Sequence, residues 1–285
     1  MINKTIKYLI DKLEPFVRDK AQAQFEAWLL LEKATGFSRV QLLIRDKELS
    51  LGQQEALETL INQRVQGKPL AYILGSIPFA GINIQVRPPI LIPRPETEEM
   101  VLWTIEKFAS EKESPLRVLD MCTGSGCIAL ALASAFPAWQ VFGIDNNEEA
   151  INLAQENKKL LKLENVFFEQ GSLFNVTDWD GPYDLIISNP PYISESSRHL
   201  VGLDVLIWED KNALFAQNEG NAFYCKLIEL AKKEIQQVSG NFPQLIVEFG
   251  VDQDQMDKYL VKYACTSIEI YRDRAGIKRW AACQV

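Results

Sequence analysis

The sequence predicts an α/β fold in which a doubly wound, mostly parallel sheet follows a small helical N-terminal domain. Residues 1–67 carry only helical patterns, whereas short apolar stretches alternate with helical ones from residue 116 onward. The length of 285 residues also exceeds the roughly 100–200 of a usual single domain. Ligands of such sheets bind at the carboxyl ends of the strands, so we expect the functional site there.

Three helices are predicted in the N-terminal domain, which we assign to residues 1–68. Apolar residues recur at helical spacing over residues 6–13 and again over residues 25–31. The third helix begins at a capping box, in which Ser50 is followed three residues later by Gln53.

A β-hairpin linker is predicted over residues 69–93. Two stretches with strand-like alternation, residues 71–74 and 82–86, lie around the turn residues Gly75 and Gly81.

A helix opens the second domain, which we assign to residues 94–285. Pro95 and the acidic residues after it suit a first helical turn, and the helix is expected to run to about residue 108. Arg94 lies between Pro93 and Pro95, and an ordinary acidic helix start does not explain it. We therefore regard Arg94 as a candidate site residue.

The remaining elements alternate as a parallel sheet requires, and a pair of strands closes the chain. The tail, residues 267–270 and 279–282, is predicted to form an antiparallel hairpin at the sheet edge. Residues 194–218 show little periodicity and are expected to form a loop that serves as a lid or substrate wall. The other predicted strands are 118–119, 141–144, 166–168, 185–187 and 245–247, and the helices are 127–135, 147–162 and 220–237.

Composition disfavours several classes of protein. The five cysteines are scattered and never spaced as Cys-x-x-Cys, so neither a disulfide framework nor a metal site is expected. The single histidine, His199, is expected to lie in a loop without a chemical role, and no Gly-x-Ser-x-Gly elbow accompanies it. No long apolar run and no leader pattern is visible, so we expect a cytoplasmic protein without a membrane span.

The net charge of −8 is unevenly distributed. Residues 1–85 carry 11 Lys and Arg against 9 Asp and Glu, whereas residues 86–285 carry 19 against 29. An acidic body is a poor electrostatic match for a nucleic-acid duplex, so no stable nucleic-acid binding is expected.

A glycine turn after the first strand of the sheet predicts a nucleotide-type cofactor. The turn, residues 120–126, contains Gly124 and Gly126, and Asp145 follows at the end of the next strand. Glycines allow a close approach of the backbone, and an acidic residue at that position can accept both hydroxyls of a ribose. The third glycine of the dinucleotide fingerprint is Ala129, which leaves a nicotinamide cofactor open, although the turn also suits the aminocarboxylate of S-adenosylmethionine.

The stretch Asn189-Pro190-Pro191-Tyr192 follows a fully apolar strand and predicts a site for a planar NH₂ group. The Asn189 amide and the Pro190 carbonyl can accept its two N–H bonds, while the ring of Tyr192 stacks on its plane. The alternative is a strand followed by a rigid turn, because Asn-Pro is a common turn starter.

These motifs together resemble the release-factor glutamine N5-methyltransferases (HemK/PrmC). The similarity is carried by residues 71–75, 92–98, 118–120 with 123–126, and 189–193 in that order, and it covers nearly the whole chain. It implies a helical substrate-recognition domain, a hairpin linker and a Rossmann-like, seven-stranded, S-adenosylmethionine-dependent methyltransferase sheet. It further implies that the substrate is the glutamine of the Gly-Gly-Gln loop of bacterial class-1 peptide chain release factors, in translation termination.

The resemblance also implies roles for individual residues. The family commonly has glycine at the position of Cys122, aspartate at that of Ser172 and proline at that of Asp210. The acceptor glutamine would be held by Asn189, Pro190, Pro191 and Tyr192. The cofactor would be held by Cys122, Thr123, Gly124, Ser125 and Gly126 around its methionine part, Asp145 at its ribose, Leu173 near its adenine, and Asn189 beside its methyl group.

Two other functions remain open from the sequence. Similar Asn/Asp-Pro-Pro-Tyr motifs serve enzymes that methylate the exocyclic amine of a flipped-out adenine, although the acidic body disfavours nucleic acid. A cofactor-binding interaction module without catalysis is the third alternative.

Overall fold

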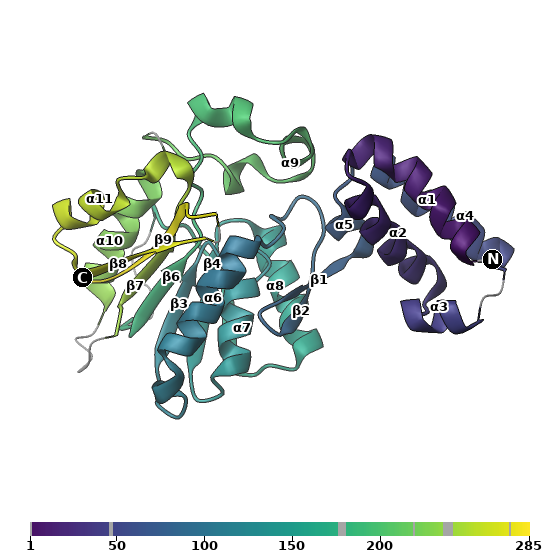
Figure 1. Cartoon of the computed structure of the whole chain (residues 1–285). Coiled ribbons are helices and arrows are strands. Elements are labelled where there is room, and N and C mark those ends of the chain that lie inside the picture. Colours follow the sequence, from purple (N-terminus) through teal and green to yellow (C-terminus); the bar gives the residue numbers. More distant parts are fainter. Residues whose placement is uncertain (1, 46–47, 176–180, 219, 236–241, 274) are drawn as a thin grey trace. The chain divides into compact units, whose positions relative to one another are not determined.

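The computed structural model divides into two units, which differ in fold class (Figure 1). The first runs to Ile77 and includes Leu203–Trp208, and the second comprises Pro78–Gly202 and Glu209–Val285. The boundary therefore lies inside the stretch 69–93 that the sequence assigns to a linker. The structure describes residues 2–45, 48–175, 181–218, 220–235, 242–273 and 275–285.

The first unit is helical, as predicted. Its core is formed by small and branched apolar side chains that include Leu9, Leu13, Ala27 and Leu31. The capping box at Ser50 is confirmed, because the Gln53 amide N–H donates to Ser50 Oγ and the Ser50 amide N–H donates to Gln53 Oε1. The long helices are α1 (Ile2–Val17), α2 (Lys20–Thr35) and α4 (Leu51–Val65), and the sequence analysis missed the short α3 (Arg39–Arg45).

Residues 71–74 form a helix, so the prediction of a strand there is wrong. The helix α5 (Leu70–Leu74) follows Pro69 and ends at Gly75, whose φ of 81° provides the left-handed C-terminal cap. Tyr72 and Ile73 are neighbours and both are buried, which a strand with one solvent face does not allow.

The hairpin itself is confirmed further along the chain. Strands β1 (Ser76–Phe79) and β2 (Ile82–Gln85) form a two-stranded sheet. Ala80 and Gly81 connect them with φ values of 44° and 85°, as a two-residue turn with two left-handed residues requires.

The second unit contains the predicted seven-stranded sheet. Its order is β5-β4-β3-β6-β7-β9-β8, in which β3 to β7 run parallel and β9 runs antiparallel to β7 and β8. The predicted tail hairpin therefore closes one edge. The strands are β3 (Arg117–Met121), β4 (Gln140–Asp145), β5 (Val166–Gln170), β6 (Leu185–Ser188), β7 (Leu245–Glu248), β8 (Thr266–Arg272) and β9 (Lys278–Gln284).

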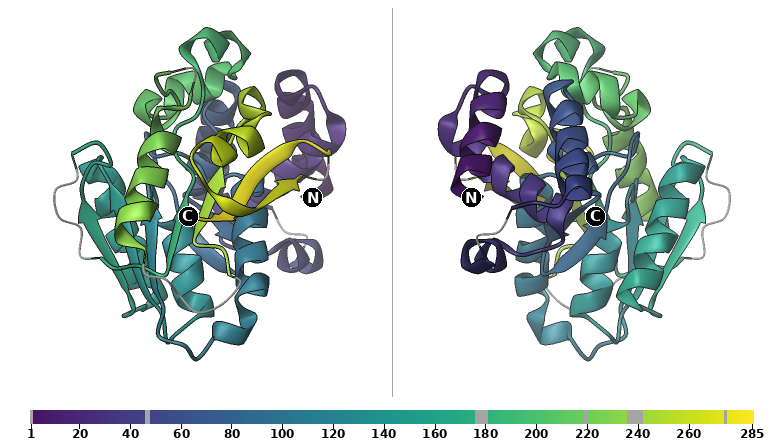
Figure 2. Two further views of the ribbon diagram at one scale, coloured as in Figure 1. Left: turned by 90° about the vertical axis from the view of Figure 1, so that its left-hand side faces the viewer. Right: turned by 90° about the vertical axis from the view of Figure 1, so that its right-hand side faces the viewer.

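Helices cover both faces of this sheet (Figures 1 and 2). One face carries α6 (Pro95–Lys107), α7 (Cys127–Ala135) and α8 (Glu148–Leu161), and all three confirm predicted helices. The other face carries α10 (Ala222–Glu234) and α11 (Met256–Lys262), which pack on alternate residues of the central strands. The helix α11 was not predicted, and residues 236–237 of the predicted helix 220–237 lie outside the described residues.

The segment 194–218 is not the irregular loop that the sequence predicts. It contains 3-10 helices at Glu195–Leu200 and Lys211–Ala213 and the short helix α9 (Leu203–Trp208). These turns are too short to show a helical period. Within the first unit, the Lys68 ammonium lies 5.8 Å from the ring centroid of Trp208.

None of the helices in the described part of the chain is both long and apolar enough to cross a membrane.

Candidate functional site

A pocket opens at the carboxyl ends of β3, β4, β5 and β6, where the fold predicts a ligand site. Its volume is about 770 Å³, including the part open to solvent. Of the predicted site residues, six line it: Cys122, Gly124, Asp145, Leu173, Asn189 and Pro191.

The glycine turn contains three residues with positive φ, namely Cys122 (63°), Gly124 (56°) and Gly126 (81°). Gly124 has open space where a side chain would be, consistent with a close approach by a ligand. A Cβ on Gly126 would lie 2.9 Å from the ring of Phe168, so this glycine permits the close packing of α7. Gly124 therefore leaves room for a ligand, whereas Gly126 leaves room for packing inside the protein.

The buried carboxylate of Asp120 holds the turn through hydrogen bonds. Its Oδ2 accepts hydrogen bonds from Thr123 Oγ1 at 2.5 Å and from the Ala129 amide N–H at 3.1 Å. Thr123 is thus bound to the protein itself and does not line the pocket. Complete burial raises the pKa of Asp120 to about 7, against the opposing effect of these two hydrogen bonds.

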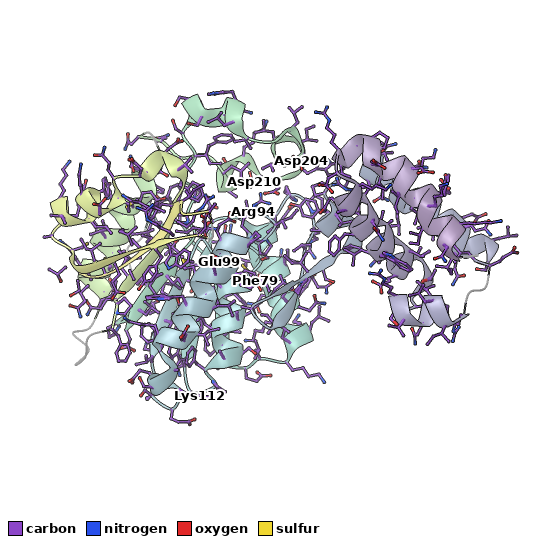
Figure 3. The ribbon with its side chains drawn as sticks, in the orientation of Figure 1. Phe79, Arg94, Glu99, Lys112, Asp204 and Asp210 are labelled. Carbon is purple, nitrogen blue, oxygen red and sulfur yellow. The ribbon has the colours of Figure 1, made fainter. Side chains whose placement is uncertain are left out.

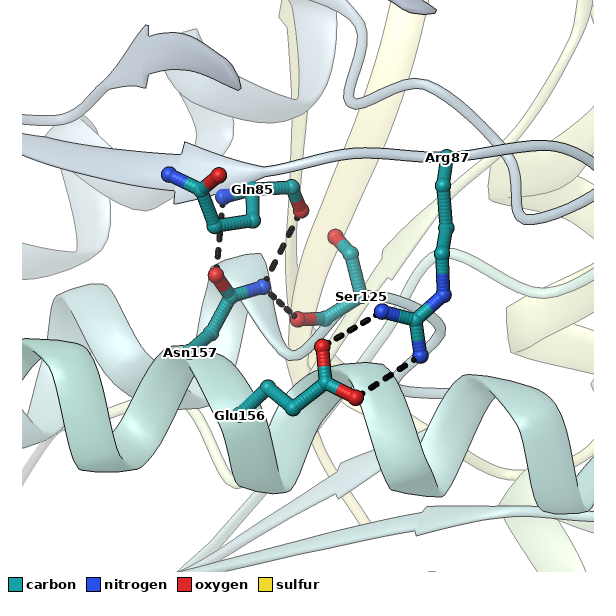
Figure 4. A network of polar contacts seen from close by, with 5 residues as sticks. All are labelled: Gln85, Arg87, Ser125, Glu156 and Asn157. Carbon is teal, nitrogen blue, oxygen red and sulfur yellow. Dashed lines mark hydrogen bonds and ion pairs between the residues drawn. The ribbon is translucent and has the colours of Figure 1, made fainter. Parts of the chain in front are cut away.

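A buried asparagine fixes the other side of the turn (Figure 4). Asn157, on α8, donates to the carbonyl of Ser125 at 3.0 Å and exchanges two hydrogen bonds with the backbone of Gln85 in β2. Next to it, the guanidinium of Arg87 forms a two-pronged ion pair with Glu156. The predicted cofactor residue Ser125 is therefore held by its main chain.

Asp145 lies at the end of β4 and faces the pocket. Its Oδ2 accepts from the Gly124 amide N–H and its Oδ1 from the Asn147 amide N–H, each at 2.9 Å. Burial raises its pKa, with a smaller contribution from the charge of Asp210. Each carboxylate oxygen has a second acceptor site, so Asp145 retains the capacity to bind two hydroxyls.

Asp210 is a second carboxylate in the pocket, which the sequence analysis did not assign to it (labelled in Figure 3). Its Oδ2 accepts from Asn147 Nδ2 at 3.1 Å, and its amide N–H donates to the Pro89 carbonyl at 2.7 Å.

Apolar side chains form the end of the pocket beyond β5. Leu173 is buried, and the exposed ring of Phe174 meets Phe223 edge-on at 5.0 Å. An apolar wall beside a carboxylate and an open glycine turn matches the aromatic base, ribose and amino-acid parts of S-adenosylmethionine. The residues present therefore fit this cofactor.

The amide site follows β6, and its asparagine is held by a chain of hydrogen bonds. Asn189 Nδ2 donates to Thr97 Oγ1 at 2.9 Å, and Thr97 Oγ1 donates to Glu248 Oε2 at 2.6 Å. Thr97 and Glu248 are buried, whereas Asn189 is half-buried. Burial raises the pKa of Glu248 to about 7.

Tyr192 packs with its ring against a glycine. A Cβ on Gly250 would lie 2.8 Å from the ring, and Gln253 Nε2 donates to the Tyr192 carbonyl at 3.1 Å. Burial raises the pKa of the Tyr192 hydroxyl, so the ring remains neutral. Pro190 is buried and, like Tyr192, is not among the pocket-lining residues.

Arg94 forms an ion pair inside the second unit (labelled in Figure 3). Its Nη2 donates to Glu209 Oε2 at 2.6 Å, and Glu209 is almost fully buried. The Arg94 side chain remains 29% exposed, and its predicted role toward a substrate stays a prediction.

Besides Asp210, the sequence analysis missed the site residues Thr97 and Glu248. Thr97 lies among acidic residues at the start of a helix, a pattern that predicts a solvent-exposed position. A signal was available for Glu248, because a single charged residue ends the apolar strand 245–247 at the ligand side of the sheet.

Two family models match the chain. The model described as "Methyltransferase domain" matches residues 112–248, and that described as "PrmC N-terminal domain" matches residues 9–75. Among solved structures, the N-terminal domain of human METTL16 in complex with SAH has a TM-score of 0.50 and 15% identity, and the match covers 72% of this chain and 76% of that one. This likeness supports the fold.

Curated relatives are much more similar in sequence. A release factor glutamine methyltransferase of Escherichia coli is 36% identical over 81% of this chain and 80% of its own length. One of Thermodesulfovibrio yellowstonii is 33% identical over 95% of both chains. On this similarity, the chain belongs to the family of release factor glutamine methyltransferases.

Proposed function

We propose that this protein methylates the side-chain amide nitrogen of a glutamine in a peptide chain release factor. The observation that carries the proposal is the Asn189 side chain at the cofactor pocket, anchored through Thr97 to Glu248. An anchored amide oxygen is suited to bind another amide's N–H group.

The cofactor is S-adenosylmethionine, which when bound supplies a methyl group activated by its sulfonium. The amide nitrogen gains this methyl group and releases one proton to solvent, and the cofactor is left as the neutral thioether. We assign its ribose to Asp145, its methionine part to Cys122 and the turn 123–126, and its adenine to the apolar wall at Leu173. Asp145 supports this assignment because it faces the pocket with acceptor capacity left.

The task of the acceptor site is to position a poor nucleophile, since the lone pair of an amide nitrogen is delocalised into its carbonyl. Asn189 and the Pro190 carbonyl accept the two N–H bonds of the glutamine, Pro191 stiffens the backbone, and the ring of Tyr192 covers the amide plane. Arg94 is assigned to contacts with the rest of the substrate. The site would accelerate methyl transfer by orienting the nitrogen and excluding water, without a general base.

The finer substrate is the Gly-Gly-Gln loop of a bacterial class-1 release factor, and the expected location is the cytoplasm, where such factors act. A glutamine can reach a pocket at the strand ends only from an extended loop with little bulk beside it, and two glycines meet that requirement. The helical unit would hold the body of the factor. Methylation of adenine is less favoured, because residues 86–285 carry 19 cationic against 29 anionic side chains.

The test is incubation with radiolabelled S-adenosylmethionine and a full-length class-1 release factor. We expect label on the wild-type factor and none after its loop glutamine is changed to alanine or to asparagine, which is one methylene too short. Parallel reactions with DNA and RNA test the adenine alternative. Label on the alanine variant, or preferential label on nucleic acid, would overturn the proposal.

A further inference from the structure

We propose that Thr97 and Glu248 are positioning residues, which hold the Asn189 amide with Oδ1 toward the acceptor and Nδ2 away from it. This inference rests on the proposed function and deepens it. It assigns a function to two residues that lie far from Asn189 in sequence and belong neither to the glycine turn 120–126 nor to the stretch 189–192.

The fold brings the three side chains together from three elements. Strands β6 and β7 are parallel neighbours with Ser188 opposite Val247, so Asn189 and Glu248 follow side by side at the ends of these strands. Thr97 comes from the first turn of α6, which Pro95 begins. Thr97 and Glu248 therefore lie in regular structure, and Asn189 is the first residue after a strand.

The direction of the hydrogen bonds follows from the number of protons. An ionised carboxylate only accepts, and a threonine hydroxyl has one proton to donate. Thr97 gives this proton to Glu248 Oε2 at 2.6 Å, so its oxygen is left to accept from Asn189 at 2.9 Å. Only the NH₂ end of the Asn189 amide can supply that bond.

The Asn189 oxygen is consequently reserved for a ligand. Among the residues that the structure describes, none donates a hydrogen bond to Asn189 Oδ1, and Asn189 lines the pocket. If the amide rotated by half a turn, its NH₂ group would face the NH₂ group of the acceptor glutamine, and two donors do not bind each other. The hydrogen bonds from Asn189 through Thr97 to Glu248, called the relay below, therefore select the orientation in which Asn189 Oδ1 faces the acceptor glutamine.

Ionisation of Glu248 sets the direction of this relay. A protonated Glu248 could donate to Thr97, whose hydroxyl would then be free to donate to Asn189 Oδ1 and to hold the amide in the rotated orientation. The groups that act electrostatically on Glu248 or on which its charge acts are Arg94, Glu96, Cys127, Tyr192, Tyr224 and Arg279.

The decisive experiment compares Thr97→Val with Thr97→Ser in the full-length protein. Valine keeps the volume of threonine and removes the hydroxyl, whereas serine keeps the hydroxyl. Thr104→Val is the matched control, because Thr104 is buried on the same helix and its hydroxyl donates only to the Met100 carbonyl of that helix. Steady-state methylation of a release factor and calorimetric titration of S-adenosylmethionine are measured for each.

We expect Thr97→Val to lower kcat by roughly 10- to 100-fold. KM for the release factor and the cofactor dissociation constant should stay within about threefold, because the lost interaction orients the acceptor without binding either ligand. Thr97→Ser should recover most of the rate. Equal rates for Thr97→Val and Thr104→Val would overturn the relay, whereas an inactive wild-type enzyme would overturn the proposed function itself.

Glu248→Gln provides a second readout that does not depend on the folding of Thr97→Val. A neutral amide at this position can donate or accept, so it no longer enforces one direction. The wild-type kcat should fall on acidification as Glu248 takes up a proton, and this acidic limb should be absent in Glu248→Gln. An unchanged pH profile in a folded Glu248→Gln variant would contradict the proposal.

Discussion

The cofactor half and the acceptor half of the site are held in place by different kinds of contact. In the cofactor half, most of the fixed contacts involve the backbone: the amide N–H groups of Gly124 and Asn147 hold Asp145, and that of Ala129 holds Asp120. In the acceptor half, a sequence of side chains, Asn189 to Thr97 to Glu248, does the same work. Backbone contacts survive most substitutions, whereas a relay of side chains fails when one hydroxyl is lost. The acceptor half should therefore be the more fragile in activity.

The largest effect is expected at Asn189. Replacement by alanine removes the acceptor for the glutamine N–H, so turnover should fall by roughly 100-fold or more while the cofactor dissociation constant changes little. Single-turnover methylation and calorimetric titration measure the two quantities. A variant that loses cofactor affinity and keeps its turnover would erase the distinction between the halves.

The reverse pattern is expected at Asp145. Asp145→Ala removes a charged acceptor from the ribose, which should weaken cofactor binding by about 1.5–3 kcal/mol for each hydrogen bond lost. At saturating cofactor, turnover should recover toward the wild-type value. A folded variant with an unchanged dissociation constant would remove Asp145 from the cofactor site.

Each half also contains one buried carboxyl group whose pKa is raised to about 7, Asp120 in the cofactor half and Glu248 in the acceptor half. In both groups the pKa in the folded protein lies above the ordinary value, which is 3.8 for Asp and 4.5 for Glu, so the folded state binds more protons than the unfolded state. The resulting stabilisation is complete below about pH 4 and is lost as the pH rises toward 7. Between pH 5 and 7, the free energy of unfolding should fall by roughly 2 kcal/mol for each group.

Urea unfolding of the wild-type protein, Asp120→Asn and Glu248→Gln across this range measures the effect. Each variant should lose its own part of the pH dependence. An identical slope in all three proteins would show that these two groups do not titrate in that window.

The smallest effect is expected at Cys122, which holds a φ of 63° without being glycine. Cys122→Ala keeps the Cβ and its strain, whereas Cys122→Gly removes it, so the glycine variant should be more stable than the alanine variant by up to about 1 kcal/mol. At Cys127, the first residue of α7, the same pair of variants should show the opposite order. Thermal unfolding compares the four variants, and the same order at both positions would rule out backbone strain at Cys122.

The sequence predicts most of the fold because its signals are local. The capping box at Ser50, the alternating strands and helices, and the glycine turn can each be recognised within a few consecutive residues. The prediction is wrong at residues 71–74, where Pro69 and Gly75 delimit a helix of one turn that an alternating pattern imitates. It also missed α3, α9 and α11, because six or seven residues do not establish a period.

The site could be predicted only in part for the same reason. Asn189 and Asp145 belong to motifs that can be recognised from residue type and spacing alone. The structure places both at one pocket. Thr97 and Glu248 are 151 residues apart, and only the register of β6 against β7 and the start of α6 bring them together. No window of the sequence contains that pairing.

The order of the strands has a consequence for synthesis on the ribosome. Strand β7, which ends in Glu248, lies between β6 and β9, and Glu248 pairs with Trp280 of β9. The cofactor half, on β3, β4 and β5, is translated long before β9, and until β9 emerges β7 remains an unpaired edge. The last strand of the sheet to be translated beside the site is therefore β9, the partner of the strand that carries Glu248.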